Sequence, residues 1–156
     1  MGSSYWVSIE MTNQTSNSMS EAARPDRPYP QPTAITAPFW DALADRKLLY
    51  QVGADDPRPI FPPQAFSPYD QSTDLRFVES RGKGSIYSYT IIHRPQTPAF
   101  DVPYVVAIIE LDEGYTMMSN IVDADPGDVA IDARVSVDFR EILPGRWIPV
   151  FLLDDH

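Results

Sequence analysis

The stretch of residues 48–74 constrains this chain most, because it is dense in Pro and turn-forming residues and can be neither a helix nor a long strand. Gly53 and Asp56 are separated by two residues, ten residues follow, and Ser67 and Asp70 repeat the two-residue gap. Cys at these four positions would form two knuckles around a tetrahedral zinc ion. The chain contains no Cys. The stretch therefore has the spacing of a zinc ribbon without its ligands.

The four ribbon positions leave little for a metal ion. Only Asp56 and Asp70 could coordinate one, whereas a closed structural zinc site needs four ligands, usually thiolate or imidazole. A weak Mg²⁺ or Ca²⁺ site through carboxylate oxygens is the alternative. We expect no bound metal, and we expect the prolines and the packing of Phe61, Phe66 and Tyr69 to hold the turns. A partner's surface is a further candidate for replacing the free energy that a structural metal supplies.

The N-terminal part predicts an arm followed by a short helix. Residues 1–35 are first polar and then rich in Pro, which is typical of a disordered or extended arm. Thr36 is a candidate N-cap, and Pro38 falls in the first turn, where its missing N–H costs nothing. These signals predict a helix over residues 36–48.

Three apolar residues of this helix, Phe39, Trp40 and Leu43, are predicted to contact other parts of an assembly. Two interpretations stay open. The side chains either pack onto the chain's own barrel or anchor a partner, as aromatic residues do at interfaces. A short helix on a proline-rich arm has little local core, and we therefore predict Phe39, Trp40 and Leu43 as partner-binding residues.

The rest of the chain, residues 75–156, predicts a small β-barrel. Residues 104–111 form a continuous apolar run, and residues 134–140 alternate apolar and polar side chains, as strands with one buried face do. Turn formers at residues 112–114 and 125–127 separate the strands. Five or six antiparallel strands at this spacing predict a mainly β protein with an OB-fold barrel, in which residues 49–74 form the ribbon.

Charge excludes some functions. The formal net charge of −10 disfavours nonspecific binding to nucleic-acid phosphates. Residues 75–95 nevertheless contain four basic residues and one acidic residue, whereas residues 101–132 contain eight acidic residues and no basic one. No segment approaches the roughly 20 apolar residues of a membrane span, and no secretory leader is visible at the N-terminus. We expect a cytoplasmic protein that binds neither membranes nor nucleic acids.

Independent catalysis is not expected. The absence of Cys excludes thiol chemistry, and the His residues are His93 and His156. A Ser-His-Asp triad would need His93 with Ser85, Ser88 or Ser119, but the sequence has no Gly-x-Ser-x-Gly elbow. We therefore predict no catalytic residue, although a contribution of His93 to a shared site stays open.

Several pieces of the sequence together resemble one known family. They are Pro38-Phe39-Trp40, Ile60-Phe61-Pro62-Pro63, the run Gly82-Lys83-Gly84-Ser85-Ile86-Tyr87-Ser88-Tyr89-Thr90, and Pro103-Tyr104-Val105-Val106-Ala107. Their order and spacing resemble the acyl-CoA-associated OB-fold proteins with a rubredoxin-like zinc ribbon, the family called domain of unknown function thirty-five. The missing Cys set is the main departure, and it removes the family's metal from the expectation.

The resemblance implies a non-catalytic auxiliary subunit of a thiolase-like enzyme, such as a thiolase, a steroid side-chain aldolase or an acyltransferase. Such a subunit orders its partner in a hetero-oligomer and helps to complete the channel for an acyl-CoA substrate. No cofactor of its own is expected, and a coenzyme A thioester would be shared with the partner. Arg81, Lys83 and Arg94 are then predicted to bind coenzyme A phosphates or an acidic patch of the partner; a solvated turn is the alternative for Arg81 and Lys83.

A free-standing OB module for single-stranded nucleic acid is the alternative function. Tyr87, Tyr89 and Tyr104 could stack on bases, but a nucleic-acid groove needs more cations than this chain supplies. We therefore favour the auxiliary subunit.

Overall fold

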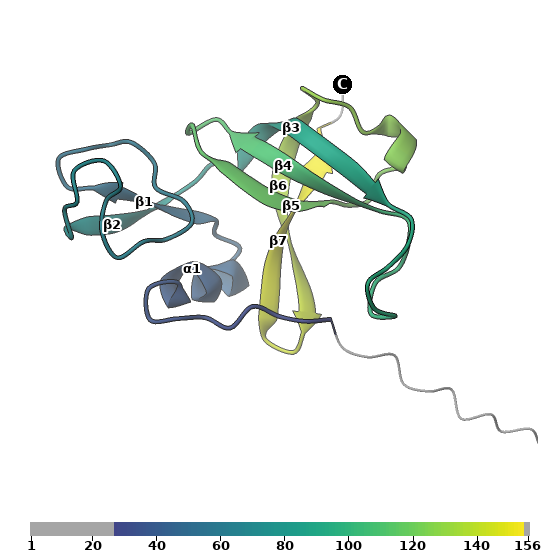
Figure 1. The fold of residues 1–156 in the computed structure, drawn as a ribbon, viewed down its shortest axis with the longest axis horizontal. Helices are drawn as coiled ribbons and strands as arrows, with labels where there is room; N and C mark the ends of the chain where they lie inside the picture. Colours follow the sequence, from purple (N-terminus) through teal and green to yellow (C-terminus); the bar gives the residue numbers. More distant parts are fainter. Residues whose placement is uncertain (1–26, 155–156) are drawn as a thin grey trace, which may run out of the picture.

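The computed structural model describes residues 27–154 of the chain. The disorder predicted for the first part of the arm falls on residues that lie outside the described ones. The described residues contain one short α-helix and seven strands, arranged as a closed barrel and a separate two-stranded sheet (Figure 1). This confirms the mainly β class and the OB-like barrel preceded by a helix. Among the described residues no helix is long and apolar enough to cross a membrane.

The barrel has five strands in the order β3–β4–β5–β7–β6, and it closes where β6 pairs with β3. Neighbouring strands are antiparallel except β5 and β7, which meet in parallel at Ile121 and Phe151. Such a small five-stranded barrel is the OB arrangement. Its interior is apolar, and Ile86, Ile109, Val135 and Phe151 are fully buried. The strands are β3 (Lys83–Ile92), β4 (Tyr104–Leu111), β5 (Thr116–Ile121), β6 (Arg134–Leu143) and β7 (Arg146–Leu153).

The Gly-x-Gly sequence at the start of β3 allows two strands to approach closely. Gly84 is paired with Leu111 of β4 on one side and with Val135 of β6 on the other. A Cβ atom on Gly84 would lie 2.4 Å from the carbonyl oxygen of Glu110, which is far inside van der Waals contact. Gly82 adopts a φ of +67°, which favours glycine. Gly82 and Gly84 therefore allow β3 to pair closely with β4 and β6, which closes the barrel.

The ribbon, residues 49–79, contains the two-stranded sheet. β1 (Leu49–Gly53) and β2 (Leu75–Glu79) pair antiparallel along their whole lengths. We predicted that the barrel begins at residue 75. The structure instead pairs β2 with β1, so the backbone groups of β2 are used in the ribbon and the barrel begins at Lys83.

The helix is shorter than predicted. α1 (Ala37–Ala42) has Pro38 in its first turn and continues as the 3₁₀ turn η1 (Leu43–Asp45). It ends at Arg46, which adopts a left-handed conformation with φ of 59°. This reversal ends the helix before residue 48 and directs the chain into β1.

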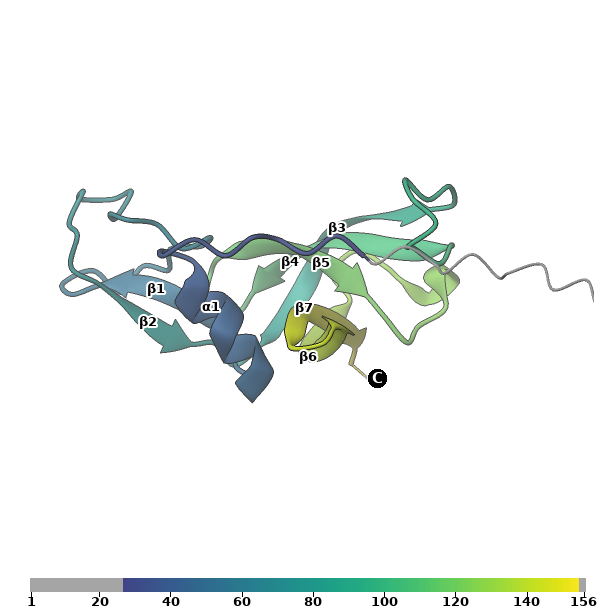
Figure 2. The ribbon, with the colours of Figure 1, turned by 90° about the horizontal axis from the view of Figure 1, so that it is seen from below.

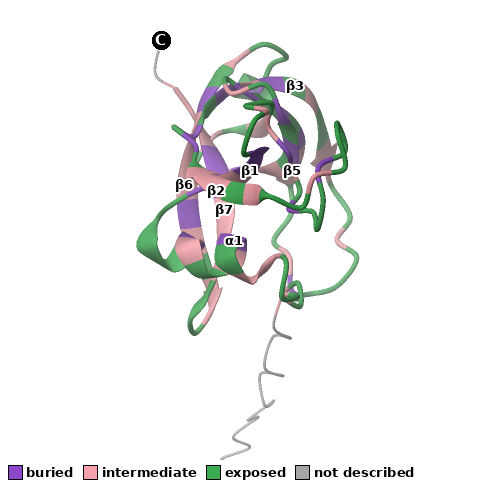
Figure 3. Cartoon of the chain, turned by 90° about the vertical axis from the view of Figure 1, so that its left-hand side faces the viewer, coloured by how far each residue is buried: buried purple, intermediate pink, exposed green. Residues whose placement is uncertain are grey.

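The apolar side of α1 packs on the chain's own barrel. Phe39 is 4% exposed and Leu43 is 0% exposed, and both belong to the core cluster that also contains Ile109 and Phe151. Figure 3 shows α1 beside β7 of the barrel. The prediction that Leu43 binds a partner is corrected, because its side chain has no free surface. Phe39 exposes only a small part, which lines a groove of the surface, and its partner-binding role stays a prediction. Trp40 is half-buried, and its partner-binding role stays a prediction.

An aromatic series fastens the helix and the ribbon to the barrel. Consecutive ring centroids in this series lie 5.0–5.6 Å apart. In order of contact, its members are Tyr29, Trp40, Phe39, Phe61, Tyr115 and Tyr50. Aromatic pairs of this kind contribute about 0.5–1.5 kcal/mol each beyond the area that they bury. The series therefore connects the strap, the helix and the ribbon to Tyr115, which lies more than 50 residues later in the sequence.

Residues 27–33 form a strap along the barrel (Figure 2). The Tyr29 hydroxyl donates a hydrogen bond to the Trp147 carbonyl at 3.3 Å, and the Arg146 guanidinium lies 5.2 Å from the Tyr29 ring centroid. At the beginning of the strap, the Arg27 guanidinium lies 4.6 Å from the ring centroid of Phe100. The strap thus crosses the β6–β7 hairpin between two hollows of the surface that are described below.

Candidate functional site

The four positions with zinc-ligand spacing form two turns but do not fit a zinc ion. The backbone N–H of Gly53 donates to the Asp56 carbonyl at 3.0 Å, and Gly53 offers no side chain as a ligand. Ser67 is fully buried, and its hydroxyl accepts a hydrogen bond from the Asp70 backbone N–H at 3.4 Å. Within residues 27–154, no group of three or more His, Cys, Asp or Glu side chains could hold a metal ion.

A cation of the chain itself lies between the two turns. The Arg58 guanidinium donates to both carboxylate oxygens of Asp56 at 2.5–3.0 Å and lies 3.8 Å from the Tyr69 ring centroid. The hydrogen bonds from Arg58 hold the pKa of Asp56 below its usual range. The Ser67 hydroxyl does the same for the pKa of Asp70. Arg58 therefore joins the first turn to the second.

The three aromatic residues that we expected to hold the turns have different roles. Tyr69 stacks under Arg58, and its hydroxyl donates to the Pro59 carbonyl at 2.8 Å. Phe61 faces the barrel, where it contacts the rings of Phe39 and Tyr115. Phe66 is 54% exposed. The expectation is wrong for Phe66, because its side chain has no core within the ribbon to enter.

The three cations predicted to bind coenzyme A phosphates are not brought together. Arg81 and Lys83 lie at the start of β3, and Arg94 follows its end, so a strand of ten residues, roughly 30 Å long, separates them. The Arg81 guanidinium lies 3.6 Å from the Glu113 carboxylate, and the Lys83 ammonium lies 3.5 Å from the Asp154 carboxylate. The prediction of one shared phosphate site is therefore corrected: these charges are apart, and two of them are paired within the chain.

No catalytic triad is present among the described residues. His93 is exposed just beyond the end of β3, and no hydrogen bond joins it to Ser85, Ser88 or Ser119 in this part of the chain. Ser119 instead donates its hydroxyl hydrogen to the Pro149 carbonyl at 2.9 Å.

A groove of about 280 Å³ lies between α1, the ribbon, β5 and β7. None of its lining residues is charged. Thr36, Phe39 and Trp40 line it from the helix, and Phe61 lines it from the ribbon. The remaining walls include Pro62, Pro63, Met118, Ser119, Ile148 and Pro149. We call this hollow the apolar groove, and its composition suits an apolar side chain or an apolar part of a ligand.

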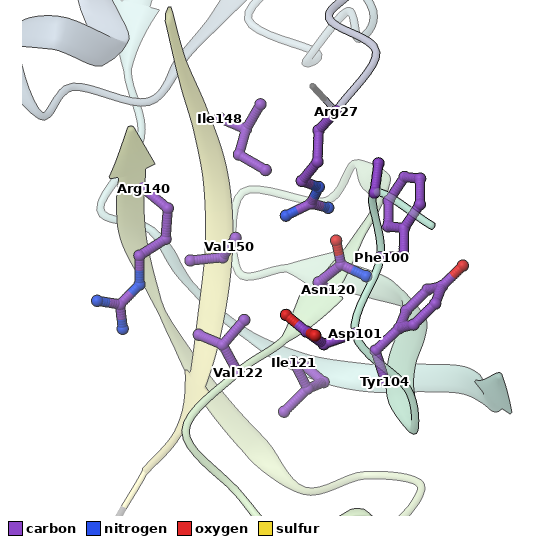
Figure 4. A pocket seen from close by; sticks show the side chains of 11 residues that line it. Arg27, Phe100, Asp101, Tyr104, Asn120, Ile121, Val122, Arg140, Ile148 and Val150 are labelled. Carbon is purple, nitrogen blue, oxygen red and sulfur yellow. The ribbon is translucent and has the colours of Figure 1, made fainter. Parts of the chain in front are cut away.

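A second cavity of about 180 Å³, which we call the mixed cavity because its walls are partly charged and mostly apolar, adjoins the apolar groove, since Asn120 and Ile148 line both. Figure 4 shows the Arg27 guanidinium, the Asn120 amide and the Asp101 carboxylate turned toward the same space. Arg140 also lines this cavity, but its guanidinium points away, and it forms ion pairs with acidic side chains of the barrel. An apolar groove and a mixed cavity with charged side chains in its walls therefore lie next to each other on the side of the barrel that the strap crosses.

Sequence reasoning identified Trp40 but missed most of the apolar groove. Its walls come from four segments whose proximity depends on barrel closure. One signal was available. The sequence of β5 alternates, so Met117 and Met118 must face opposite sides of the strand, and one of these two methionines must lie outside the core.

Comparison with known proteins shows similar sequences. A family profile described as "ChsH2, C-terminal OB-fold domain" matches residues 77–140. A DUF35 domain-containing scaffold protein of Methanocaldococcus jannaschii is 38% identical over 106 residues, which cover 66% of this chain and 75% of that protein. A probable enoyl-CoA hydratase alpha subunit of Thermomonospora curvata is 37% identical over 125 residues. That match covers 80% of this chain, and the chain spans about two fifths (39%) of the hydratase subunit's length.

A solved structure is also similar. The DUF35 chain of the structure named "Ltp2-ChsH2(DUF35) aldolase" matches with a TM-score of 0.75 and 35% sequence identity. The match covers 80% of this chain and 98% of that chain. It therefore extends beyond residues 77–140, which the family profile matches.

Proposed function

The chain belongs to the DUF35 family of OB-fold proteins, and from this premise we propose that it is a non-catalytic auxiliary subunit of a thiolase-like enzyme that acts on acyl-CoA substrates. The observation that carries the proposal is the likeness to the DUF35 chain of the Ltp2–ChsH2 aldolase, over 98% of that chain. The name of that structure joins a DUF35 protein to a second protein in one aldolase.

The chemistry of the described residues supports this role. They provide no nucleophile beside a base and no metal site, so bond-making and bond-breaking groups would come from the partner. The similar hydratase subunit is named for a coenzyme A thioester substrate, which supports an acyl-CoA substrate for the assembly. The coenzyme A thioester would be shared between the subunits, and the chain binds no cofactor of its own.

The geometry supports a contribution to a shared channel. An acyl-CoA has an apolar acyl group and a polar, anionic carrier. The apolar groove and the mixed cavity, into which Arg27 turns its guanidinium, lie side by side and share two wall residues, Asn120 and Ile148. A channel completed by this side of the barrel could therefore contact both parts of such a substrate.

Co-expression tests the proposal. The chain should be produced together with each thiolase-like protein of its own organism and analysed by size-exclusion chromatography. We expect one of them to co-elute with the chain, and acyl-CoA turnover to require both proteins. The proposal fails if no thiolase-like protein co-elutes or if the chain alone turns over acyl-CoA. Sub-micromolar binding of single-stranded DNA at physiological salt, measured by fluorescence polarisation, would instead favour the nucleic-acid module.

A further inference from the structure

The middle of the outer face of the β3–β4–β5 sheet is nearly free of charge, with Lys83 at the edge of the face where β3 begins. The strand register places nine residues on this face in three cross-strand rows, whereas intervening residues such as Ile109 and Met117 are buried in the barrel. Glu110 is the single charged residue among the nine. The rows are Ser88–Ile108–Met118, Thr90–Val106–Asn120 and Ser85–Glu110–Thr116. Six of the nine residues are polar, as is ordinary for a sheet face in water, but only one is charged in a chain whose net charge is −10.

Large apolar side chains project from the middle of this face. Met118 is 74% exposed, and Ile108, its direct cross-strand neighbour, is 38% exposed. A register irregularity between Ile86 and Ser88 leaves Tyr87 unpaired with β4, and Tyr87 is 62% exposed. Apolar residues that gather on a surface mark an interaction site more reliably than single ones do.

The same face continues into the apolar groove. Met118 stands in the first row and also lines the groove, where it shares the wall with Trp40, Pro62 and Pro63. We call the two rows without Glu110, together with the groove, the uncharged face. On this face Met118 projects beside a groove, and a protein partner of complementary shape can pack against both.

We propose that the uncharged face, centred on Met118, is the docking surface for the thiolase-like subunit, and that an apolar side chain of that subunit enters the groove beside Trp40. This inference rests on the proposed function. Cores of protein interfaces are depleted in charged residues, as this face is.

Charge selects this occupant over others. A second copy of the chain would bring another net charge of −10 to the contact, and the two would repel each other. Nucleic acids and anionic lipid surfaces require Lys or Arg at the contact, and the three rows contain neither. A partner with an apolar, uncharged patch is the occupant that remains.

Charge introduced at Met118 tests the proposal. Met118→Glu and Met118→Lys should each weaken binding of the co-eluting thiolase-like subunit by about tenfold or more, measured by calorimetry. Both signs should act alike, because the cost comes from burying a charge in an apolar contact. Met118→Leu should keep the affinity within about threefold, because the two side chains have similar volumes. Folding should be unaffected, since the Met118 side chain is mostly in water.

Ile131→Glu is the matched control. Ile131 is 60% exposed in the loop before β6 and lies outside the uncharged face, so binding should change by less than about twofold. If wild-type protein binds the subunit and both charged Met118 variants bind equally well, the docking surface is wrong while the proposed function stands. If wild-type protein binds no thiolase-like subunit, the proposed function fails, and the proposed docking surface fails with it. If wild-type protein alone dimerises and Met118→Glu is monomeric, the occupant is a second copy and the proposal is overturned.

Discussion

The barrel and the ribbon belong to one chain but are stabilised in different ways. The barrel closes a continuous ladder of paired strands around fully buried side chains such as Val135 and Phe151. The ribbon has one strand pair and few buried apolar residues, among them Val52 and Ile60. Its two turns are joined by Arg58, whose side chain is 58% exposed, and exposed ion pairs contribute little to stability.

The difference shows how a ribbon without metal can persist. A structural zinc ion would supply the free energy that such a small unit needs, since small units bury too little surface to fold alone. This ribbon instead packs Phe61 between Phe39 and Tyr115 and so uses the core of the barrel. We conclude that the ribbon depends on the barrel for its packing.

Removing a side chain from the centre of the barrel should have the largest effect. Phe151→Ala should lower the free energy of unfolding by about 3–5 kcal/mol, because it leaves a cavity where Phe151 is now fully buried. The measurement is urea denaturation followed by circular dichroism. Ribbon and barrel should lose structure together. A loss below about 1 kcal/mol would contradict the view that the barrel core stabilises both regions.

Removing the contact between the two regions should have an intermediate effect. Phe61→Ala should cost about 1–3 kcal/mol, since Phe61 is half-buried and loses two ring contacts. Hydrogen exchange should accelerate in residues 49–79 and remain slow in the barrel. Phe66→Ala is the matched control within the ribbon, and it should change stability by less than about 0.5 kcal/mol because Phe66 is exposed. Equal effects of the two variants would refute the role given to Phe61.

Acid should loosen the ribbon through Asp56. The pKa of Asp56 is lower in the folded protein than in the unfolded chain, so the folded state binds fewer protons. This stabilisation is present above the ordinary Asp pKa of about 3.9 and is lost as pH falls through the lower folded value. Asp56→Asn should therefore flatten the pH dependence of hydrogen exchange in the ribbon below about pH 4.

A corresponding acid in the barrel provides the control for this effect. Arg134 hydrogen-bonds Asp112 and holds the pKa of Asp112 below its usual range. Asp112→Asn should change the pH dependence of barrel amides and leave that of ribbon amides as in the wild type. If Asp56→Asn alters both regions alike, the two are not separable in this way.

Chelation should have the smallest effect. The ribbon positions do not fit zinc, so excess EDTA should shift the melting temperature by less than about 1 °C. Elemental analysis of the purified protein should find no stoichiometric zinc. One zinc ion per chain, or a large fall in melting temperature with EDTA, would show that the ribbon still depends on metal.

The fold of the barrel could be predicted from the sequence because the pattern of apolar residues within a strand indicates which of its side chains are buried. The alternation in residues 134–140 and the apolar run in residues 104–111 indicate which side chains are inside. β2 was assigned to the wrong sheet, since five residues of strand-forming sequence contain no information about which strand they pair with. That choice is made by tertiary contacts.

The candidate site was harder to predict, because it depends on which segments meet. The sequence shows that Phe39 and Leu43 are apolar. That both side chains pack into the core of the barrel is seen only in the folded structure. Met118 and Ile148 lie 30 positions apart and line one groove because β5 and β7 are neighbours in the barrel. Arg81 and Arg94 are 13 positions apart in the sequence, but the extended strand β3 between them keeps them apart in space.

The aromatic series also affects the order in which the chain can fold during synthesis. Phe61 leaves the ribosome about 50 residues before Tyr115, which corresponds to roughly 3–10 s of translation. During this interval the ribbon has no ring from the barrel to pack against. A ribbon with four zinc ligands could fold as soon as it emerged and bound metal. This ribbon emerges before the barrel but can complete its packing only after Tyr115, the residue directly before β5, has been made.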